Sequence, residues 1–156
     1  MNISSDFSEL LRIFNEGRVR YLVVGGHAVM RYTEPRYTKD LDLWVDPTRA
    51  NAQRVYRALR RFGAPLAGVR VENFTEKDLV FQVGVAPVRV DILMDAPGLS
   101  FRPAWRNRME VDFGGEPAHL ISREDLIVSK RATNRLQDRI DLRNLLQAKP
   151  VRQKKG

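Results

Sequence analysis

Residues 40–45 read DLDLWV, a stretch in which acidic and apolar residues alternate with a period of two. Because successive side chains of a strand point to opposite faces, the stretch predicts a strand that carries Asp40 and Asp42 on one face. Residues 88–93, VRVDIL, repeat the alternation with a single acid, Asp91. If the two strands are in register, they bring the three carboxylates together on one face of a sheet.

These three acids form a candidate catalytic cluster. Carboxylates a few ångströms apart repel each other and raise each other's pKa, which a nearby cation offsets. Mg²⁺ prefers oxygen ligands and bridges carboxylates to substrate phosphates. Three acids on adjacent strands can hold two metal ions about 3.5 to 4 Å apart, which activate an attacking oxygen and stabilise the leaving one. We therefore interpret Asp40, Asp42 and Asp91 as catalytic residues and as ligands of Mg²⁺ or Mn²⁺, expected as two ions. Taken alone, the DLD stretch also fits a solvent-facing pair of acids.

A pair of glycines, Gly25 and Gly26, lies upstream of the acids. Residues 19–24 are short and rich in β-branched residues, so they predict a buried strand, and residues 27–32 predict a brief helix. Glycines between a strand and a helix let backbone N–H groups approach a phosphate, and the helix dipole favours the anion. A lone Gly-Gly pair indicates only a tight turn. Followed by two acid-bearing strands, it predicts a phosphate-binding turn.

The rest of the chain predicts the remaining elements of a single domain. The Pro- and Gly-rich stretch 95–116 is expected to be irregular. We expect an α/β (α+β) fold over residues 1–148, with a mixed sheet of four to five strands, helices mainly on one side, and a basic tail at 149–156. The other predicted elements are helices over 6–16, 48–62, 125–132 and 136–146, and strands over 79–85 and 88–93 joined tightly through Ala86 and Pro87.

Composition narrows the class of protein. The chain has no Cys, which excludes disulfides, thiolate metal sites and a cysteine nucleophile. Its apolar stretches are far shorter than the ~20 residues that span a bilayer, and no signal peptide is visible, so we expect a cytoplasmic protein with no membrane partner. Twenty-seven Lys and Arg against 19 acids give a net charge of +8, typical of a protein that meets polyanions. The alternative is that the basic charge only keeps the protein soluble.

The motifs together resemble those of the DNA polymerase beta-like nucleotidyltransferase superfamily. The matching segments are VVGG at 23–26, DLDL at 40–43 and VDI at 90–92. VGGHAV at 24–29 and RYTKDLD at 36–42 are similar to a smaller bacterial group that includes abortive-infection and toxin–antitoxin nucleotidyltransferases. The closing segment of that group resembles residues 125–142, so the likeness spans most of residues 20–146.

The resemblance implies a nucleotidyltransferase fold and a role for each matching residue. Gly25 and Gly26 would approach the triphosphate of a nucleoside triphosphate substrate, and Lys130 would contact its oxygens. Asp40 and Asp42 would bind metal, while Asp91 would complete the site and help to activate the acceptor. For Lys130 the alternative is an ordinary exposed helix lysine.

Four further positions carry weaker expectations. Arg36 and Thr38 would contact the phosphate or the base of the nucleotide, or would only shape the loop before the acid strand. His27 stands where many relatives have Ser, and its simpler interpretation is a residue of the helix N-terminus with an ordinary hydrogen bond. Arg135, Asp138 and Asp141 follow one another at three-residue steps, which favours a structural ladder of ion pairs over catalysis.

The expected reaction is metal-dependent transfer of a nucleoside monophosphate from a nucleoside triphosphate to an acceptor, with release of pyrophosphate. The acceptor is expected to be RNA, with tRNA first, and the protein to work within a toxin–antitoxin system beside a cognate toxin or antitoxin. Three alternatives stay open at this point. They are a protein-modifying transferase of the antitoxin kind, an inactive nucleic-acid-binding member of the fold, and a metal-dependent nuclease.

Overall fold

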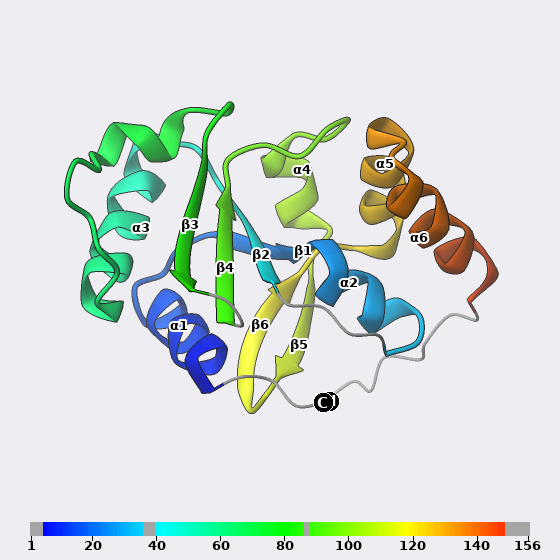
Figure 1. Ribbon diagram of the computed structural model, residues 1–156, viewed down its shortest axis with the longest axis horizontal. Coiled ribbons are helices and arrows are strands. Elements are labelled where there is room, and N and C mark those ends of the chain that lie inside the picture. The colour runs from blue at the N-terminus through cyan, green and yellow to red at the C-terminus, as the bar shows by residue number, and fades with distance from the viewer. Residues whose placement is uncertain (1–4, 36–39, 86–87, 149–156) are drawn as a thin grey trace.

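A computed structural model describes residues 5–35, 40–85 and 88–148 (Figure 1). Within them the chain alternates helices and strands around one sheet, which confirms the α/β class. In chain order the elements are α1 (Ser5–Glu16), β1 (Tyr21–Val24), α2 (Gly25–Tyr32), β2 (Asp40–Val45), α3 (Arg49–Phe62), a 3₁₀ turn (Val71–Thr75), β3 (Val80–Val85), β4 (Val88–Leu93), α4 (Phe101–Arg106), β5 (Met109–Phe113), β6 (Glu116–Leu120), α5 (Arg123–Thr133) and α6 (Leu136–Gln147).

The strands form one mixed sheet in the order β3-β4-β2-β1-β6-β5. Two neighbouring pairs, β2 with β4 and β1 with β6, are parallel, and the other pairs are antiparallel. A parallel pair needs a crossover, and between β2 and β4 the chain passes through α3 and β3. The acid-bearing strands are therefore adjacent in the interior of the sheet.

The sequence signals that end the predicted helices act as expected. The Thr48 side chain accepts a hydrogen bond from the backbone N–H of Asn51 at the start of α3, and Gly63 ends that helix in the left-handed conformation, with φ +94°. Ser122 caps α5 in the same way through the backbone N–H of Asp125. The connection at 86–87 and the tail at 149–156 lie outside the described residues.

The stretch 95–116, expected to be irregular, instead contains α4, β5 and the beginning of β6, so the sheet has six strands. The proline and the glycines of this stretch are compatible with a helix and a hairpin at the positions they occupy. Pro103 lies in the first turn of α4, where proline is tolerated. Gly114 and Gly115 both have positive φ and form the turn between the antiparallel β5 and β6.

Helices cover both faces of the sheet instead of mainly one. The ring of Phe14 in α1 lies 5.8 Å from that of Tyr21, whereas Phe101 of α4 lies 5.1 Å from Trp44. Tyr21 pairs with Val45, the neighbour of Trp44, so the two aromatic rings point to opposite faces. The second face also carries buried apolar residues, Trp44 among them at 1% exposure, and α4 shields them from water.

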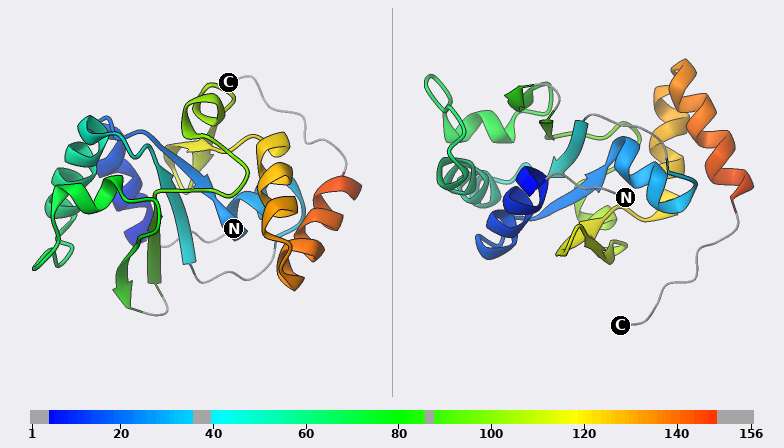
Figure 2. Two further views of the ribbon diagram at one scale, coloured as in Figure 1. Left: turned by 90° about the horizontal axis from the view of Figure 1, so that it is seen from above. Right: turned by 60° about the horizontal axis from the view of Figure 1, so that its bottom comes forward.

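Two pairs of helices lie at opposite ends of the molecule. In both figures α1 and α3 lie together at one end of the molecule and α5 and α6 at the other (Figures 1 and 2). No helix of the described residues is long and apolar enough to span a membrane.

Candidate active site

The parallel pair β2 and β4 places two of the predicted acids side by side. Asp42 is the direct partner of Asp91 in the register of the two strands. Asp40 lies two residues before Asp42 and therefore on the same face of the sheet. Alternation along two strands thus predicted correctly that the three acids share one face.

Asp40 differs from the other two in its surroundings. Its Oδ2 lies 3.0 Å from a guanidinium nitrogen of Arg89, and Arg89 is also its partner in the register. The alternation that places Asp91 on this face of the sheet places Arg89 there too. Gln82, the register partner of Asp91 on β3, is a second neighbour that the pattern did not single out.

The acids perturb each other as expected for converging carboxylates. Burial, and then the charges of Asp91 and Asp40, raise the pKa of Asp42 to about 7. Burial and the charge of Asp40 also raise the pKa of Asp91, against the opposing effect of Arg89. The folded chain therefore holds Asp42 at the edge of ionisation near neutral pH.

A divalent cation fits this donor set. Asp91 Oδ1 is buried and makes no hydrogen bond within the described part of the chain, so it is an acceptor without a donor. A hard cation prefers such oxygen ligands and would offset the repulsion that raises both pKa values. Among the residues described, no three His, Cys, Asp or Glu side chains are already arranged around one point. The carboxylate of Asp40 is paired with Arg89.

Gly25 connects the acid strand to the predicted phosphate turn. It has φ +70°, and a Cβ atom built on it would overlap the carboxylate of Asp42. Val24, one residue before, is the register partner of Asp42. Glycine is therefore required at position 25 for two independent reasons, backbone conformation and space.

The N-terminus of α2 presents free backbone donors beside the acids. The helix begins at Gly25, and its N-cap residue is Val24, whose apolar side chain cannot accept a hydrogen bond. The first N–H groups of a helix have no partner within the helix, and with the helix dipole they favour an anion. Gly26 lies in this first turn, as the predicted phosphate-binding role requires.

Lys130 on α5 is held by two buried carboxylates. Its Nζ lies 3.2 Å from Asp138 Oδ1 and 3.1 Å from Asp141 Oδ2, and these two acids are 1% and 0% exposed. Its positive charge also lowers the pKa of Asp42, so it faces the acid strand. Lys130 is therefore not the exposed surface lysine of the alternative interpretation.

The predicted ladder of ion pairs on α6 is only partly present. Arg135 pairs with Asp138 through a contact of 2.8 Å, whereas Asp141 is bound by Lys130 and by the side-chain amide of Gln137. Burial alone would raise the pKa of Asp138, but hydrogen bonds from Arg135 and other donors outweigh burial and bring the pKa well below its usual value. The acids are thus buried anchors between α5 and α6 and not a surface ladder.

His27 lacks the ordinary hydrogen bond that its position suggested. Both ring nitrogens are buried and have no partner among the described residues. The ring packs between Phe7, at 5.8 Å, and Phe113, at 5.4 Å. Burial lowers the pKa of His27 to about 4, so the imidazole is neutral at physiological pH. Arg36 and Thr38 lie outside the described residues.

A family match covers nearly the whole chain. Residues 1–151 match a family described as "Nucleotidyltransferase of unknown function (DUF6036)". No curated protein sequence matches the chain.

Three solved structures are similar to the chain. The lincosamide antibiotic adenylyltransferase LnuA, bound to lincomycin, has a TM-score of 0.61 at 18% identity and covers 94% of this chain and 99% of its own. The antibiotic-resistance factor ANT(2'')-Ia has a TM-score of 0.58 at 15% identity, with 90% and 80% covered. A putative nucleotidyltransferase from Thermotoga maritima, TM1012, has a TM-score of 0.59 at 15% identity, with 93% and 95% covered. These likenesses confirm the nucleotidyltransferase fold.

Proposed function

The chain belongs to the nucleotidyltransferase family of unknown function DUF6036, and from this we propose that it transfers a nucleoside monophosphate from a nucleoside triphosphate to an acceptor hydroxyl. One observation carries the proposal. Asp42 and Asp91 are register partners on parallel strands, and the backbone of Gly25 fits against the Asp42 carboxylate at the start of α2. These contacts support the proposal because candidate ligands for a cation lie beside candidate donors for a phosphate.

Each group of the chain has a distinct part in the proposed reaction. Asp42 and Asp91 would hold Mg²⁺ or Mn²⁺, with Asp40 joining them on leaving Arg89, and the metal would supply charge neutralisation at the triphosphate. The N–H groups at Gly25 and Gly26 would position the phosphates, and Lys130 would add a positive charge near them. Asp91 would accept the proton of the attacking hydroxyl. In phosphoryl transfer most catalysis comes from such positioning and charge stabilisation.

For the acceptor we propose RNA, with tRNA first. The support is the net charge of +8, because a basic protein attracts phosphate backbones, together with the resemblance to toxin-type nucleotidyltransferases. That resemblance also supports a cognate toxin or antitoxin as a partner.

A small-molecule hydroxyl is the second candidate acceptor. It is favoured by the structural similarity to LnuA and ANT(2'')-Ia, which are an antibiotic adenylyltransferase and an antibiotic-resistance factor. One labelling experiment distinguishes RNA, a small molecule and a protein as the acceptor. In that experiment, each α-labelled nucleoside triphosphate is incubated with the protein, Mg²⁺, bulk tRNA and a lincosamide, and the label is followed into RNA, small molecule or protein.

The variant Asp42→Asn tests the transfer chemistry. We expect it to fold and to release no pyrophosphate in Mg²⁺, because an amide is a poor replacement for a metal-binding carboxylate. Chelation of the metal from the wild-type protein should have the same effect, reversed by added Mg²⁺. Asp46→Asn is the matched control, since Asp46 lies just beyond the far end of β2 and should keep wild-type turnover.

The same variant has an expected stability signature without metal. Because the pKa of Asp42 is raised to about 7, its favourable contribution to stability is present at low pH and is lost as pH rises through 7. The loss accumulates between the unfolded value of 3.8 and about 7, and Asp42→Asn removes it. The variant should therefore melt at the same temperature as the wild type at about pH 4 or below and at a higher temperature at pH 8. Wild-type turnover by Asp42→Asn in Mg²⁺ would refute the assigned role.

A further inference from the structure

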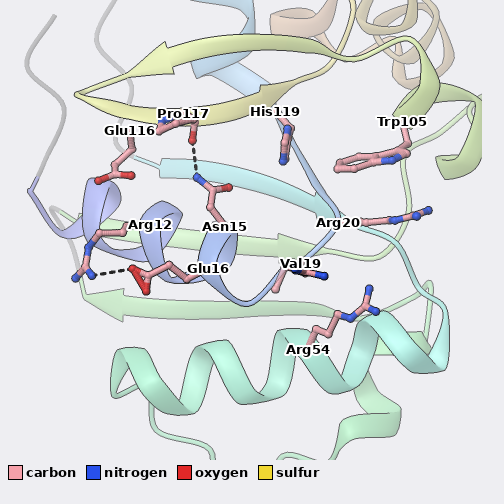
Figure 3. Close-up of a pocket in the computed structure, with 11 residues that line it drawn as sticks. Arg12, Asn15, Glu16, Val19, Arg20, Arg54, Trp105, Glu116, Pro117 and His119 are labelled. Atoms are coloured by element: carbon pink, nitrogen blue, oxygen red, sulfur yellow. Dashed lines mark hydrogen bonds and ion pairs between the residues drawn. The ribbon is translucent and has the colours of Figure 1, made fainter.

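A second candidate site lies at the end of β1 remote from Gly25. A groove of about 790 Å³ opens between α1, α3 and β6. Figure 3 shows Arg20, Arg54 and Trp105 toward one end of it and Arg12 toward the other. The transfer site follows β1, whereas this groove lies beside the residues that precede β1, so the two are separate.

The groove exists because β1 and β6 pair only toward their ends. Val23 and Leu120 are register partners, but the start of β6 carries Pro117, which has no N–H to donate to a neighbouring strand. The Pro117 carbonyl accepts instead from the Asn15 side-chain amide at 2.6 Å, and Asn15 accepts from the Tyr21 hydroxyl at 2.8 Å. This chain of hydrogen bonds fills the space between the strands and gives the groove a fixed polar wall.

The lining carries uncompensated positive charge. Arg18, Arg20 and Arg54 form no ion pair with any described residue. Of the two acids in the lining, Glu16 and Glu116, the first is already held by two other arginines at 3.2 and 2.7 Å. Three arginines that converge on one groove without counter-ions favour an anionic ligand.

Arg20 is fixed in place from below. Its backbone N–H donates to Asn51 Oδ1 at 2.8 Å, and its carbonyl accepts from Asn51 Nδ2 at 3.1 Å. Asn51 is only 1% exposed, so this support is rigid. The Arg20 guanidinium lies 5.6 Å from the centre of the half-buried Trp105 ring, which Arg108 covers at 3.8 Å and on which Phe101 stacks at 5.9 Å.

Arg18 occupies a backbone conformation that disfavours it. It has φ +55° directly after α1, at a position where helices commonly end with glycine. A non-glycine residue in this region is strained, and such strain is often found at functional sites. Arg18 is one of the residues that line the groove, where an arginine can offer a charge that glycine cannot.

We propose that this groove binds a single-stranded segment of RNA, with its phosphates on Arg18, Arg20 and Arg54. A positively charged groove that follows the phosphate backbone binds single strands without sequence preference. The inference rests in part on the proposed function, because it assigns where an RNA acceptor is held away from the transfer site.

The test measures binding without the reaction. A fluorescent 12-nucleotide RNA of mixed sequence is titrated with the full chain by anisotropy at several salt concentrations, in EDTA and without nucleotide. We expect the logarithm of affinity to fall with the logarithm of salt, by about 0.7 for each phosphate contact. The triple variant R18G/R20Q/R54Q should weaken binding at least tenfold and reduce that slope by about 2.

Single variants separate binding from folding. R54Q should weaken binding several-fold, whereas R60Q, with the same charge change elsewhere on α3, should not. R18G should weaken binding and leave the melting temperature unchanged or higher, because glycine suits the left-handed position. A purely structural Arg18 would instead lose stability on this change.

Two results would overturn the inference. One is wild-type RNA affinity in the triple variant, and the other is equal affinity for an acidic peptide of the same charge. Binding is measured in EDTA and so does not depend on transfer. If Asp42→Asn loses transfer but still binds RNA, the proposal for the groove is unaffected. If the triple variant keeps its RNA affinity and still transfers nucleotide to RNA, the proposal for the groove is refuted and the proposed function is not.

Discussion

At the scale of single residues, Gly25 carries the most information about the site. It fits directly against a candidate metal ligand, since any side chain on it would occupy the space of the Asp42 carboxylate. The sequence suggested glycine there for approach to a phosphate. The close fit to Asp42 depends on the antiparallel pairing of β1 with β2 and was not visible in the motif.

Gly25→Ala should therefore damage both stability and activity. An alanine at φ +70° costs about 1 to 2 kcal/mol of folding free energy in the left-handed region. Displacement of Asp42 by its methyl group should reduce transfer about 100-fold, the effect of a misplacement of about 1 Å. Urea unfolding and pyrophosphate release measure the two. Gly26→Ala is the control and should fold normally, and equal stability loss in both variants would contradict the argument.

His27 is a second residue whose environment has a measurable consequence. Its pKa is lowered to about 4 by burial, and the charge of Asp40 only partly opposes this. Its contribution to stability is present above the unfolded pKa of about 6.5 and is lost as pH falls through 4, because only the unfolded chain then gains the proton. The loss should reach about 3 kcal/mol for the wild type.

His27→Phe should remove that part of the acid sensitivity, since Phe keeps the ring contacts and cannot be protonated. Urea unfolding at pH 7, 5.5 and 4.5 measures the difference between the two proteins. The gap should widen in favour of the variant as pH falls. A constant gap across the three pH values would show that His27 is not the titrating group.

At the scale of elements, α5 and α6 are joined by charges that are almost out of water. Lys130 is the cation shared by Asp138 and Asp141, and its removal takes one counter-charge from each of these two buried acids. Breaking a buried pair in this way typically costs about 3 to 5 kcal/mol. Lys130→Met should therefore lower stability by about that amount as well as affecting transfer.

A second substitution distinguishes the electrostatic explanation from simple loss of packing. Asp141→Asn in the Lys130→Met background should recover part of the lost stability, because it removes one of the two buried charges that Lys130 neutralises. Chemical denaturation of the four proteins of this cycle measures the coupling. Additive losses would indicate that the two side chains do not interact in the way the structure implies.

The elements also show where reasoning from sequence succeeds. Strict alternation predicted strands β2 and β4, and helical spacing with end signals predicted α1 and α3. Between 95 and 116 the same reasoning failed, because Pro103 and the two glycines at 114 and 115 are compatible with both irregular chain and regular elements. Whether these residues lie in irregular chain or in regular elements depends on tertiary contacts, such as that of Phe101 with Trp44, and no local pattern encodes them.

At the scale of the whole molecule, the candidate site depends on strand order. Alternation predicted the shared face of the three acids, and the structure adds that β2 and β4 are parallel neighbours. Arg89 as the partner of Asp40, and the buried anchoring of Lys130, both required the packed structure. The groove at the other end of β1 was unpredictable for the same reason, since its lining comes from α1, α3, α4 and β6.

The crossover between β2 and β4 also has a consequence for synthesis. A chain is made from its N-terminus, so β1, β2 and α3 leave the ribosome before the strand that carries Asp91. At that stage Asp42 is present without its partner, and Lys130 has not yet been added. The nascent protein can build part of its sheet while the candidate site is still incomplete, and the site is completed only when β4 and α5 dock onto what has already formed.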